Sequence, residues 1–296
     1  MKLLPWQVEM WRHTAKLASN NTLPHAFLFS GLEGLGKLEF AQQVAGFLLC
    51  ENTQADESLS MIACGECKQC RLMAADTHPD VKLIKPDEGS SVLKIDTIRD
   101  LVQFFQKSSL QGGRKISILA PAESLNHNAA NALLKTLEEP TQNSIIILIS
   151  HSPGQLLPTI RSRCQVLEFH QPLKSLALQW LADSVGTIGS EKCDEESLHA
   201  LLELASNAPL KALQYSKMGA LEENNRMLDE LASLLKRECL ATSLAARWND
   251  DLSLLRLAWT IRWLEAIVNI KMSVSGNADR DAHGSKMMSY LADSSS

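Results

Sequence analysis

The sequence has 296 residues, of which 45% are hydrophobic and 21% charged, proportions typical of globular proteins with two or three domains. Its net charge of −5 argues against a protein that grips DNA alone, because phosphate contacts need a basic surface. No apolar run reaches the roughly 18 residues of a membrane span, and the first residues lack a signal peptide, so we expect a cytoplasmic protein.

Five short apolar runs predict the strands of one sheet. They cover residues 25–30, 80–85, 115–120, 144–150 and 164–169. Predicted helices alternate with them over residues 5–20, 37–50 and 96–107, and a fourth helix is capped by Asn126 and ends before Pro140. Continuous apolar runs indicate strands covered on both faces, so we expect an α/β domain with a parallel five-stranded sheet over residues 1–170.

Strand patterns stop after about residue 170. Three short helices predicted at 172–185, 194–206 and 209–218 indicate a small helical lid domain over residues 171–219. Longer amphipathic helices at 221–240 and 252–272 indicate an all-α domain over residues 220–296. The last residues, 273–296, are rich in Ser, Gly and Asp, and we expect them to be loose apart from 286–291.

A glycine-rich loop follows the first predicted strand. It reads Gly31-Leu-Glu-Gly34-Leu-Gly36-Lys37 and matches G-x-x-x-x-G-K, a loop whose amides and lysine hold phosphates. Gly31, Gly34, Gly36 and Lys37 are therefore the candidate residues for ATP or ADP. The motif needs Ser or Thr at its last position to bind Mg²⁺, but this chain has Leu38.

The acidic half of an ATPase site is also missing from its usual position. The predicted strand 115–120 runs into Pro121, with no aspartate at its tip, and Glu123 comes a few residues later. With two supports for Mg²⁺ absent, hydrolysis is not expected. A degenerate site that binds nucleotide weakly or without turnover, a purely structural turn and an active ATPase site remain as alternatives.

Four cysteines predict a structural metal site within an inserted module over residues 50–70. Cys64, Cys67 and Cys70 follow C-x-x-C-x-x-C spacing, with Cys50 upstream. Four thiolates suit tetrahedral Zn²⁺ and leave no open position for catalysis. An iron–sulfur cluster and free buried thiols are the alternatives. His78, which precedes Pro79, is interpreted as a neighbouring loop residue.

Two arginines flank a serine just before the fifth predicted strand. Arg161 and Arg163 lie in the segment Ile-Arg-Ser-Arg-Cys. Arginine suits phosphate because its planar group is permanently charged and donates two hydrogen bonds at once. One arginine could reach the ATP of a neighbouring subunit. A solvated pair or a surface salt bridge is the alternative.

These segments together resemble one family, the AAA+ clamp-loader subunits of bacterial DNA polymerase III. The likeness rests on five segments: residues 31–37, the four cysteines, residues 77–80 (Thr-His-Pro-Asp), residues 129–140 (Ala-Ala-Asn-Ala-Leu-Leu-Lys-Thr-Leu-Glu-Glu-Pro) and residues 160–164. It covers residues 1–170 well, and the helical remainder matches in layout only. Leu38 and Pro121 place the chain with the delta-prime branch, whose own nucleotide site is degenerate.

The resemblance implies a hetero-oligomeric ring that loads the sliding clamp onto primed DNA during replication. It implies that Arg163 is the trans-acting arginine, that the zinc module lies on the first domain, and that the C-terminal helices form a collar. The partners implied are the motor subunits and the clamp-opening delta subunit. The sliding clamp and primed DNA are implied as indirect partners, which the chain contacts through the complex. The chain would then be an accessory subunit of a DNA-directed DNA polymerase, a nucleotidyltransferase, without catalysis of its own.

Two other functions compete with this interpretation. The chain could be an ATP-hydrolysing motor subunit of the same loader or another P-loop ATPase, which Leu38 argues against. It could instead be a zinc-module protein that binds DNA alone, which its acidic net charge argues against. A salt-sensitive gel shift of the lone chain would favour that last reading.

Overall fold

The computed structural model describes residues 3–87, 89–111, 113–186 and 194–272. The chain divides into two compact units, the first ending at Leu176 and the second beginning at Ala177. The further division of the helical remainder at residue 219 stays a prediction. The predictions made for residues 273–296, including 286–291, lie outside the described residues.

Five parallel strands form the sheet of the first unit, in the order β4-β5-β6-β1-β7. Every residue of β1, β5 and β6 is buried, as expected for parallel strands covered on both faces. The predicted five-stranded parallel sheet is therefore confirmed. The strands span Ala26–Ser30 (β1), Val81–Ile84 (β4), Lys115–Leu119 (β5), Ser144–Ser150 (β6) and Gln165–Glu168 (β7).

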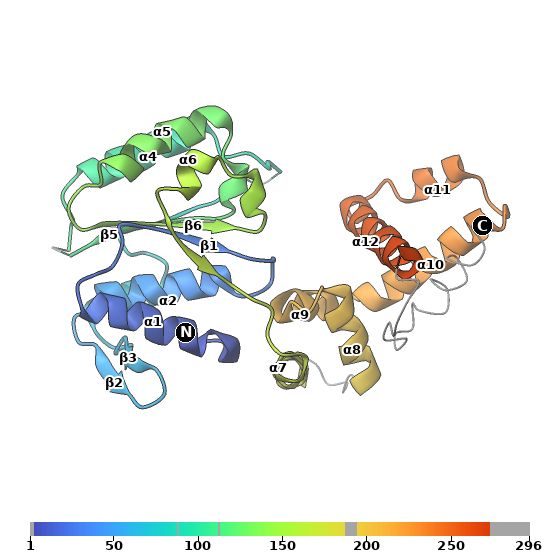
Figure 1. The fold of residues 1–296 in the computed structure, drawn as a ribbon, viewed down its shortest axis with the longest axis horizontal. Coiled ribbons are helices and arrows are strands. Elements are labelled where there is room, and N and C mark those ends of the chain that lie inside the picture. Colours follow the sequence, from blue (N-terminus) through green and yellow to red (C-terminus); the bar gives the residue numbers. More distant parts are fainter. Residues whose placement is uncertain (1–2, 88, 112, 187–193, 273–296) are drawn as a thin grey trace. The chain divides into compact units, whose positions relative to one another are not determined.

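Helices cover both faces of this sheet, with α1 and α2 on one face and α4 and α5 on the other (Figure 1). The Asn126 side chain accepts a hydrogen bond from the Ala129 amide at 2.8 Å and so caps α5, as the sequence predicts. The helices span Val8–Ser19 (α1, after the 3-10 turn Pro5–Gln7), Lys37–Leu49 (α2), Ile95–Gln106 (α4), His127–Glu138 (α5) and Pro158–Arg161 (α6).

The two faces of the sheet have different cores. Towards α4 and α5 the core is mainly aliphatic and includes Leu28, Ile98 and Leu133, each at most 1% exposed. Towards α1 and α2 it is aromatic, with ring centroids 5.4–6.0 Å apart. The rings belong to Trp11, Phe29, Phe40, Phe47 and Phe169. This packing fixes the end of β7 beside the loop that follows β1.

A small hairpin in the cysteine module was not predicted from the sequence. Its strands, Gln54–Asp56 (β2) and Ser60–Ile62 (β3), pair antiparallel and are only three residues long. They carry little apolar pattern of their own. Contacts from α1 hold them instead, because Trp11 Nε1 donates to the Met61 carbonyl at 3.0 Å and Arg12 Nε donates to the Ser58 carbonyl at 2.6 Å.

The second unit is entirely helical among the described residues. The helix predicted over 221–240 ends earlier, at Leu235, because Arg237 adopts a left-handed backbone with φ of 61°, and the short helix that begins at Ala241 was not predicted. None of the helices in the described ranges is both long and apolar enough to cross a membrane. The helices are Lys174–Gly186 (α7), Glu195–Leu204 (α8), Pro209–Lys217 (α9), Ala220–Leu235 (α10), Ala241–Arg247 (α11) and Ser253–Met272 (α12).

One core joins the helices of this second unit. Leu181, Leu201, Met227 and Trp259 are each at most 2% exposed and belong to a single hydrophobic cluster. Arg256, on α12, bridges to Glu223 of α10 at 2.7 Å and is 6% exposed. Residues from the helices predicted as lid and from those predicted as collar therefore belong to one hydrophobic cluster.

Candidate functional site

The glycine loop connects β1 to α2 at the carboxyl end of the sheet. A side chain on Gly31 would place its Cβ 2.4 Å from the Phe169 carbonyl oxygen, and Gly31 has φ of 141°. Gly34 and Gly36 both have φ of 83°. Glycine is thus required by close approach at the first position and favoured by backbone conformation at the other two. The loop ends at the N-terminus of α2, where backbone amides can bind an anion.

Lys37 is directed into this loop. Its ammonium donates to the carbonyl oxygens of Gly31 and Leu32, both at 2.6 Å, and the residue is 3% exposed. Burial lowers the pKa of Lys37 to about 8, although the carboxylate charges of Glu123, Glu33 and Glu39 oppose this change. The four predicted phosphate-loop residues are therefore brought together, with a cation at their centre.

Two residues of the N-terminal turn also hold the loop. Gln7 Nε2 donates to the Gly36 carbonyl at 2.8 Å and to the Leu35 carbonyl at 3.2 Å, and Trp6 Nε1 donates to the Leu35 carbonyl at 3.0 Å. The sequence places Trp6 and Gln7 in the helix predicted over residues 5–20 and does not predict these contacts. One feature of the sequence could have indicated these contacts. Gln7 is a polar residue at a position that helical spacing places near the core.

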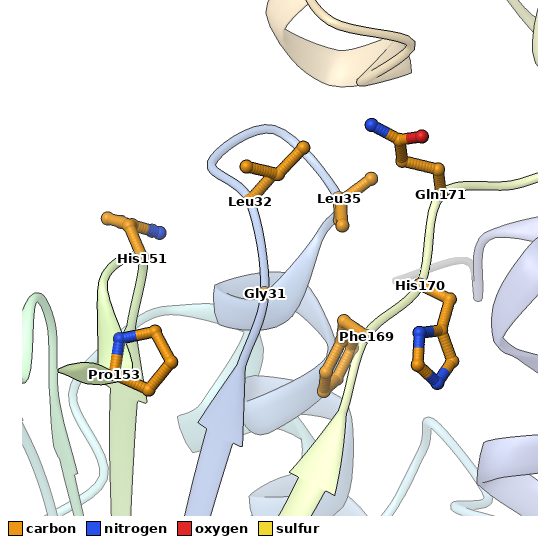
Figure 2. Close-up of a pocket in the computed structure, with 8 residues that line it drawn as sticks. All are labelled: Gly31, Leu32, Leu35, His151, Pro153, Phe169, His170 and Gln171. Carbon is orange, nitrogen blue, oxygen red and sulfur yellow. The ribbon is translucent and has the colours of Figure 1, made fainter.

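An open pocket of about 550 Å³ lies over the loop. Figure 2 shows Leu32 and Leu35 on the loop above Gly31, with His151 on one side and Gln171 on the other. The pocket lies at the carboxyl ends of β6, β1 and β7, where open α/β sheets bind ligands. Its lining comprises Gly31, Leu32, Leu35, His151, Pro153, Phe169, His170 and Gln171.

Of the two positions that would support Mg²⁺, the first offers no oxygen ligand and the second offers a carboxylate with one oxygen already hydrogen-bonded. Leu38 is the second residue of α2 and offers only carbon. Glu123, in the 3-10 turn Ala122–Ser124 after β5, accepts a hydrogen bond from the His151 amide at 2.8 Å through Oε1. Its Oε2 is buried without a hydrogen-bond partner among the described residues. The negative charge of Glu123 acts on Lys37 by raising its pKa against the effect of burial.

The four predicted cysteine ligands come together in space. Their Sγ atoms all lie within 4.8 Å of one another, and no further His, Asp or Glu joins this group in the part of the chain that is described. Tetrahedral Zn–S bonds of about 2.3 Å would place the sulfurs about 3.8 Å apart, so the donor set fits Zn²⁺. Cys50 follows α2, Cys67 caps α3 (Lys68–Ala74), and Cys64 and Cys70 complete the group.

Backbone amides point at these sulfurs. The amides of Cys64, Cys67 and Cys70 donate to the sulfurs of Cys50, Cys64 and Cys67, at 3.3–3.4 Å. Burial opposes ionisation of the Cys67 thiol, but hydrogen bonds outweigh it and lower its pKa to about 6. These amides therefore favour the thiolate at Cys67, the form that binds metal, whereas burial raises the pKa of Cys50 and of Cys70.

His78 links the module to the sheet and is not a member of the cysteine group. Its Nδ1 accepts from the Asp80 amide at 3.1 Å and its Nε2 lies 3.0 Å from Gln69 Oε1. Nε2 must then carry the proton and donate it to Gln69. Asp80 in turn accepts from the Ser109 hydroxyl and the amides of Leu110 and Gln111, at 2.8–2.9 Å. His78 and Asp80, which are 5% and 1% exposed, thus form a buried connection within the Thr-His-Pro-Asp segment.

Arg163 lies apart from the pocket, just beyond α6. Its Nη2 pairs with Glu138 Oε1 at 2.7 Å, and its side chain is 35% exposed. Its Nη1 donates to the Thr159 carbonyl at 2.9 Å. Arg161, by contrast, lies at the end of α6 as an exposed residue. The chain's own glycine loop and its candidate trans-acting arginine therefore occupy different places.

Known proteins match this chain over nearly its full length. The family described as "DNA polymerase III, delta subunit" matches residues 6–173. The Pseudomonas aeruginosa protein named DNA polymerase III subunit delta' is 36% identical over 293 residues, which cover 99% of this chain and 85% of that protein. The chain belongs to the DNA polymerase III subunit delta' family. The delta' subunit of Yersinia pestis is 33% identical over 88% of this chain and 74% of its own length.

Membership of the delta' family confirms the resemblance inferred from the five sequence segments. The family match ends at residue 173, so it covers the α/β unit, the cysteine module and Arg163. Among solved structures, a gamma subunit-related protein from Thermotoga maritima is 20% identical over 95% of the chain with a TM-score of 0.46, too low to add to this assignment. The roles of individual residues in this delta' family chain rest on their geometry.

Proposed function

We propose that this chain is the delta' subunit of a DNA polymerase III clamp loader and that it donates Arg163 to the ATP site of an adjacent motor subunit. It helps to load the sliding clamp onto primed DNA and hydrolyses no ATP itself. The observation that carries the proposal is the contrast between two sites. The glycine loop leads into Leu38, which cannot bind Mg²⁺, whereas Arg163 lies partly exposed just beyond α6.

The absence of hydrolysis follows from the chemistry of phosphoryl transfer. That reaction depends on Mg²⁺ to neutralise charge on the β- and γ-phosphates. Leu38 supplies no hydroxyl, and one oxygen of Glu123 is already bonded to the His151 amide. Lys37 and the loop amides can still hold a phosphate, so the site binds ATP or ADP weakly and without turnover.

Arg163 has the chemistry that a neighbour's ATP site needs. An arginine supplied in trans stabilises the charge that develops on the transferred phosphoryl group and contributes about 10³ to 10⁵ in rate. A guanidinium cannot lose its charge, and its planar fork matches phosphate oxygens. Two hydrogen-bonded anchors hold the Arg163 group without burying it.

The cysteine module holds structural Zn²⁺ in this proposal. Cys50, Cys64, Cys67 and Cys70 would bind the ion with all four positions filled, which leaves none for a reacting water. When bound, the ion crosslinks the end of α2 to α3 and the hairpin. Its role is to keep this module folded on the surface of the first unit.

An apolar stripe on α12 supports assembly through a helical collar. Its members recur at intervals of three and four residues and are 49–79% exposed, the pattern of a helix that packs against another helix. We propose that helices of neighbouring clamp-loader subunits, the motor subunits and the delta subunit, cover it in the hetero-oligomer. The stripe consists of Leu254, Leu257, Ile261, Leu264 and Val268.

The proposal is tested by two substitutions compared in the reconstituted loader. Lys37→Ala should leave the clamp- and DNA-stimulated ATPase unchanged, because the site it alters does not turn over. Arg163→Ala should lower this ATPase rate, because the substitution alters the active ATP site of the adjacent motor subunit. The isolated chain should show no ATP turnover above background.

The second candidate function is an ATP-hydrolysing motor subunit of the same loader. The intact geometry of Gly31, Gly36 and Lys37 favours it. Turnover by the isolated chain that Lys37→Ala abolishes would establish that function and overturn the first proposal.

A further inference from the structure

Helix α5 ends in two acidic residues. Glu138 is its last residue and Glu139 its C-terminal cap. The C-terminus of a helix carries partial negative charge, so an acidic side chain there costs about 0.3–1 kcal/mol. The Glu138 side chain is 49% exposed, so its burial does not offset this unfavourable free energy. Its contribution must come from the group that it contacts.

That group is the Arg163 guanidinium. Glu138 Oε1 lies 2.7 Å from Arg163 Nη2, while the Thr159 carbonyl accepts from Arg163 Nη1 at 2.9 Å. The two anchors come from different elements, the end of α5 and the first turn of α6. Together they fix both terminal nitrogens of one guanidinium group.

The frame that carries these anchors is rigid. Helices α5 and α6 pack against each other, and Figure 1 shows them on the same face of the sheet. Leu137, the neighbour of Glu138, and Ile160, the neighbour of Thr159, are 2% and 1% exposed in one hydrophobic cluster. Packed cores hold side chains in defined positions, so the two anchors keep a fixed separation.

We propose that Glu138 is the positioning residue of Arg163, an inference that rests on the proposed function of Arg163 as a trans-acting arginine. An arginine side chain loses about 2 kcal/mol of rotamer freedom when it is fixed. Glu138 fixes it before a neighbour's phosphate arrives. Of the five N–H groups on a guanidinium, the two anchors take two, and a longer contact of Nη1 with the Ser162 hydroxyl at 3.5 Å takes a third. Two remain for the phosphate.

The strength of the ion pair between Glu138 and Arg163 decides whether Glu138 positions the arginine or withholds it from ATP. A solvent-exposed ion pair contributes about 0–1 kcal/mol. Charge-assisted hydrogen bonds from arginine to phosphate are much stronger, so Glu138 cannot withhold Arg163 from ATP. The same magnitude limits the effect of removing Glu138 to about fivefold in rate.

The test uses Glu138→Gln in the reconstituted loader, with Glu139→Gln as the matched control. Both variants lose one acidic charge at the same helix end, but only the first removes the charge that pairs with the Arg163 guanidinium. After assembly is confirmed, kcat and KM for ATP are measured with clamp and primed DNA. We expect Glu138→Gln to lower kcat about two- to fivefold with KM unchanged, Glu138→Asp to recover part of it, and Glu139→Gln to match wild type.

Three outcomes would overturn the inference. If Glu138→Gln matches Glu139→Gln while Arg163→Ala is slow, Glu138 does not position the arginine, although the proposed function stands. If Glu138→Gln raises the ATPase in the absence of clamp and DNA, the pair sequesters Arg163. If Arg163→Ala itself matches wild type, the proposed function fails and the inference with it. The double variant Arg163→Ala/Glu138→Gln should be no slower than Arg163→Ala alone.

Discussion

Gly31 shows how one residue sets the shape of the phosphate loop. It is the point at which the chain leaves β1, and its backbone passes so close to Phe169 that a Cβ would lie 2.4 Å from the carbonyl oxygen. That distance is far below van der Waals contact. The contacted atom belongs to the backbone, so it cannot rotate away as a flexible side chain could. The loop and the strand β7 are therefore coupled through a glycine.

Gly31→Ala should destabilise the first unit by about 2–4 kcal/mol, since it combines overpacking with an unfavourable φ. Denaturant unfolding followed by circular dichroism measures this change. Gly46→Ala is the matched control, because Gly46 lies inside α2 with nothing within 4 Å of an added Cβ. It should stabilise by about 0.5–1 kcal/mol. Equal effects at the two positions would contradict the account of Gly31.

Individual site residues differ in how far the sequence predicts them. Lys37 and the cysteines belong to motifs with fixed spacing, and such motifs can be recognised in a single sequence. Gln7 and Glu138 act through contacts across the fold, with partners 29 residues away for Gln7 and on a different element for Glu138. Periodicity carries no information on such contacts.

At the scale of elements, the cysteine module depends on crosslinks more than on a core of its own. Its hairpin strands are three residues each and partly exposed. Small units of this kind need a metal or disulfide to stay folded. Four sulfurs within 4.8 Å of one another supply the site.

Cys67→Ser should release the metal and loosen the module while leaving the sheet folded. We expect purified wild type to contain one equivalent of zinc by elemental analysis and the variant to contain much less. Cys239→Ser, at a half-buried cysteine outside the group, should keep the zinc. A Cys67→Ser protein that retains one equivalent with unchanged melting would contradict the assignment.

The sequence predicts long, strongly patterned elements well and short ones poorly. The strand β6 has the predicted bounds, residues 144–150, because an unbroken run of isoleucine and leucine admits few other readings. The hairpin β2-β3 was missed because contacts from Trp11 and Arg12 hold it. The helix predicted over 221–240 ran past the end of α10 at Leu235, because a left-handed arginine at position 237 has no sequence signature.

At the scale of the whole molecule, the apolar stripe on α12 predicts how the chain enters its complex. Leu257→Glu together with Leu264→Glu should weaken incorporation into the loader about 100-fold, since burying each leucine contributes about 1.5 kcal/mol or more. Size-exclusion chromatography with the partner subunits measures this. Leu240→Glu is the control, because Leu240 is 71% exposed but lies outside the stripe.

If the double variant assembled as well as Leu240→Glu, the stripe would not be an interface. Circular dichroism must first show that they fold, which is expected because the altered side chains are exposed and outside the buried cluster around Trp259. The presence of a sheet domain and a helical unit was predictable from the change in periodicity near residue 170. The shared core of the second unit was not, because periodicity shows which face is apolar but not which helix covers it.

The most direct test of the account is the clamp- and DNA-stimulated ATPase of the reconstituted loader with Arg163→Ala, beside Arg161→Ala. Both variants remove one arginine from the same short segment, so they match in charge. Loss of a trans-acting arginine costs about 10³ to 10⁵ at the site it serves, diluted by the motor sites that remain. The account predicts a clear fall for Arg163→Ala and wild-type rate for Arg161→Ala. Equal rates in two fully assembled loaders would contradict it.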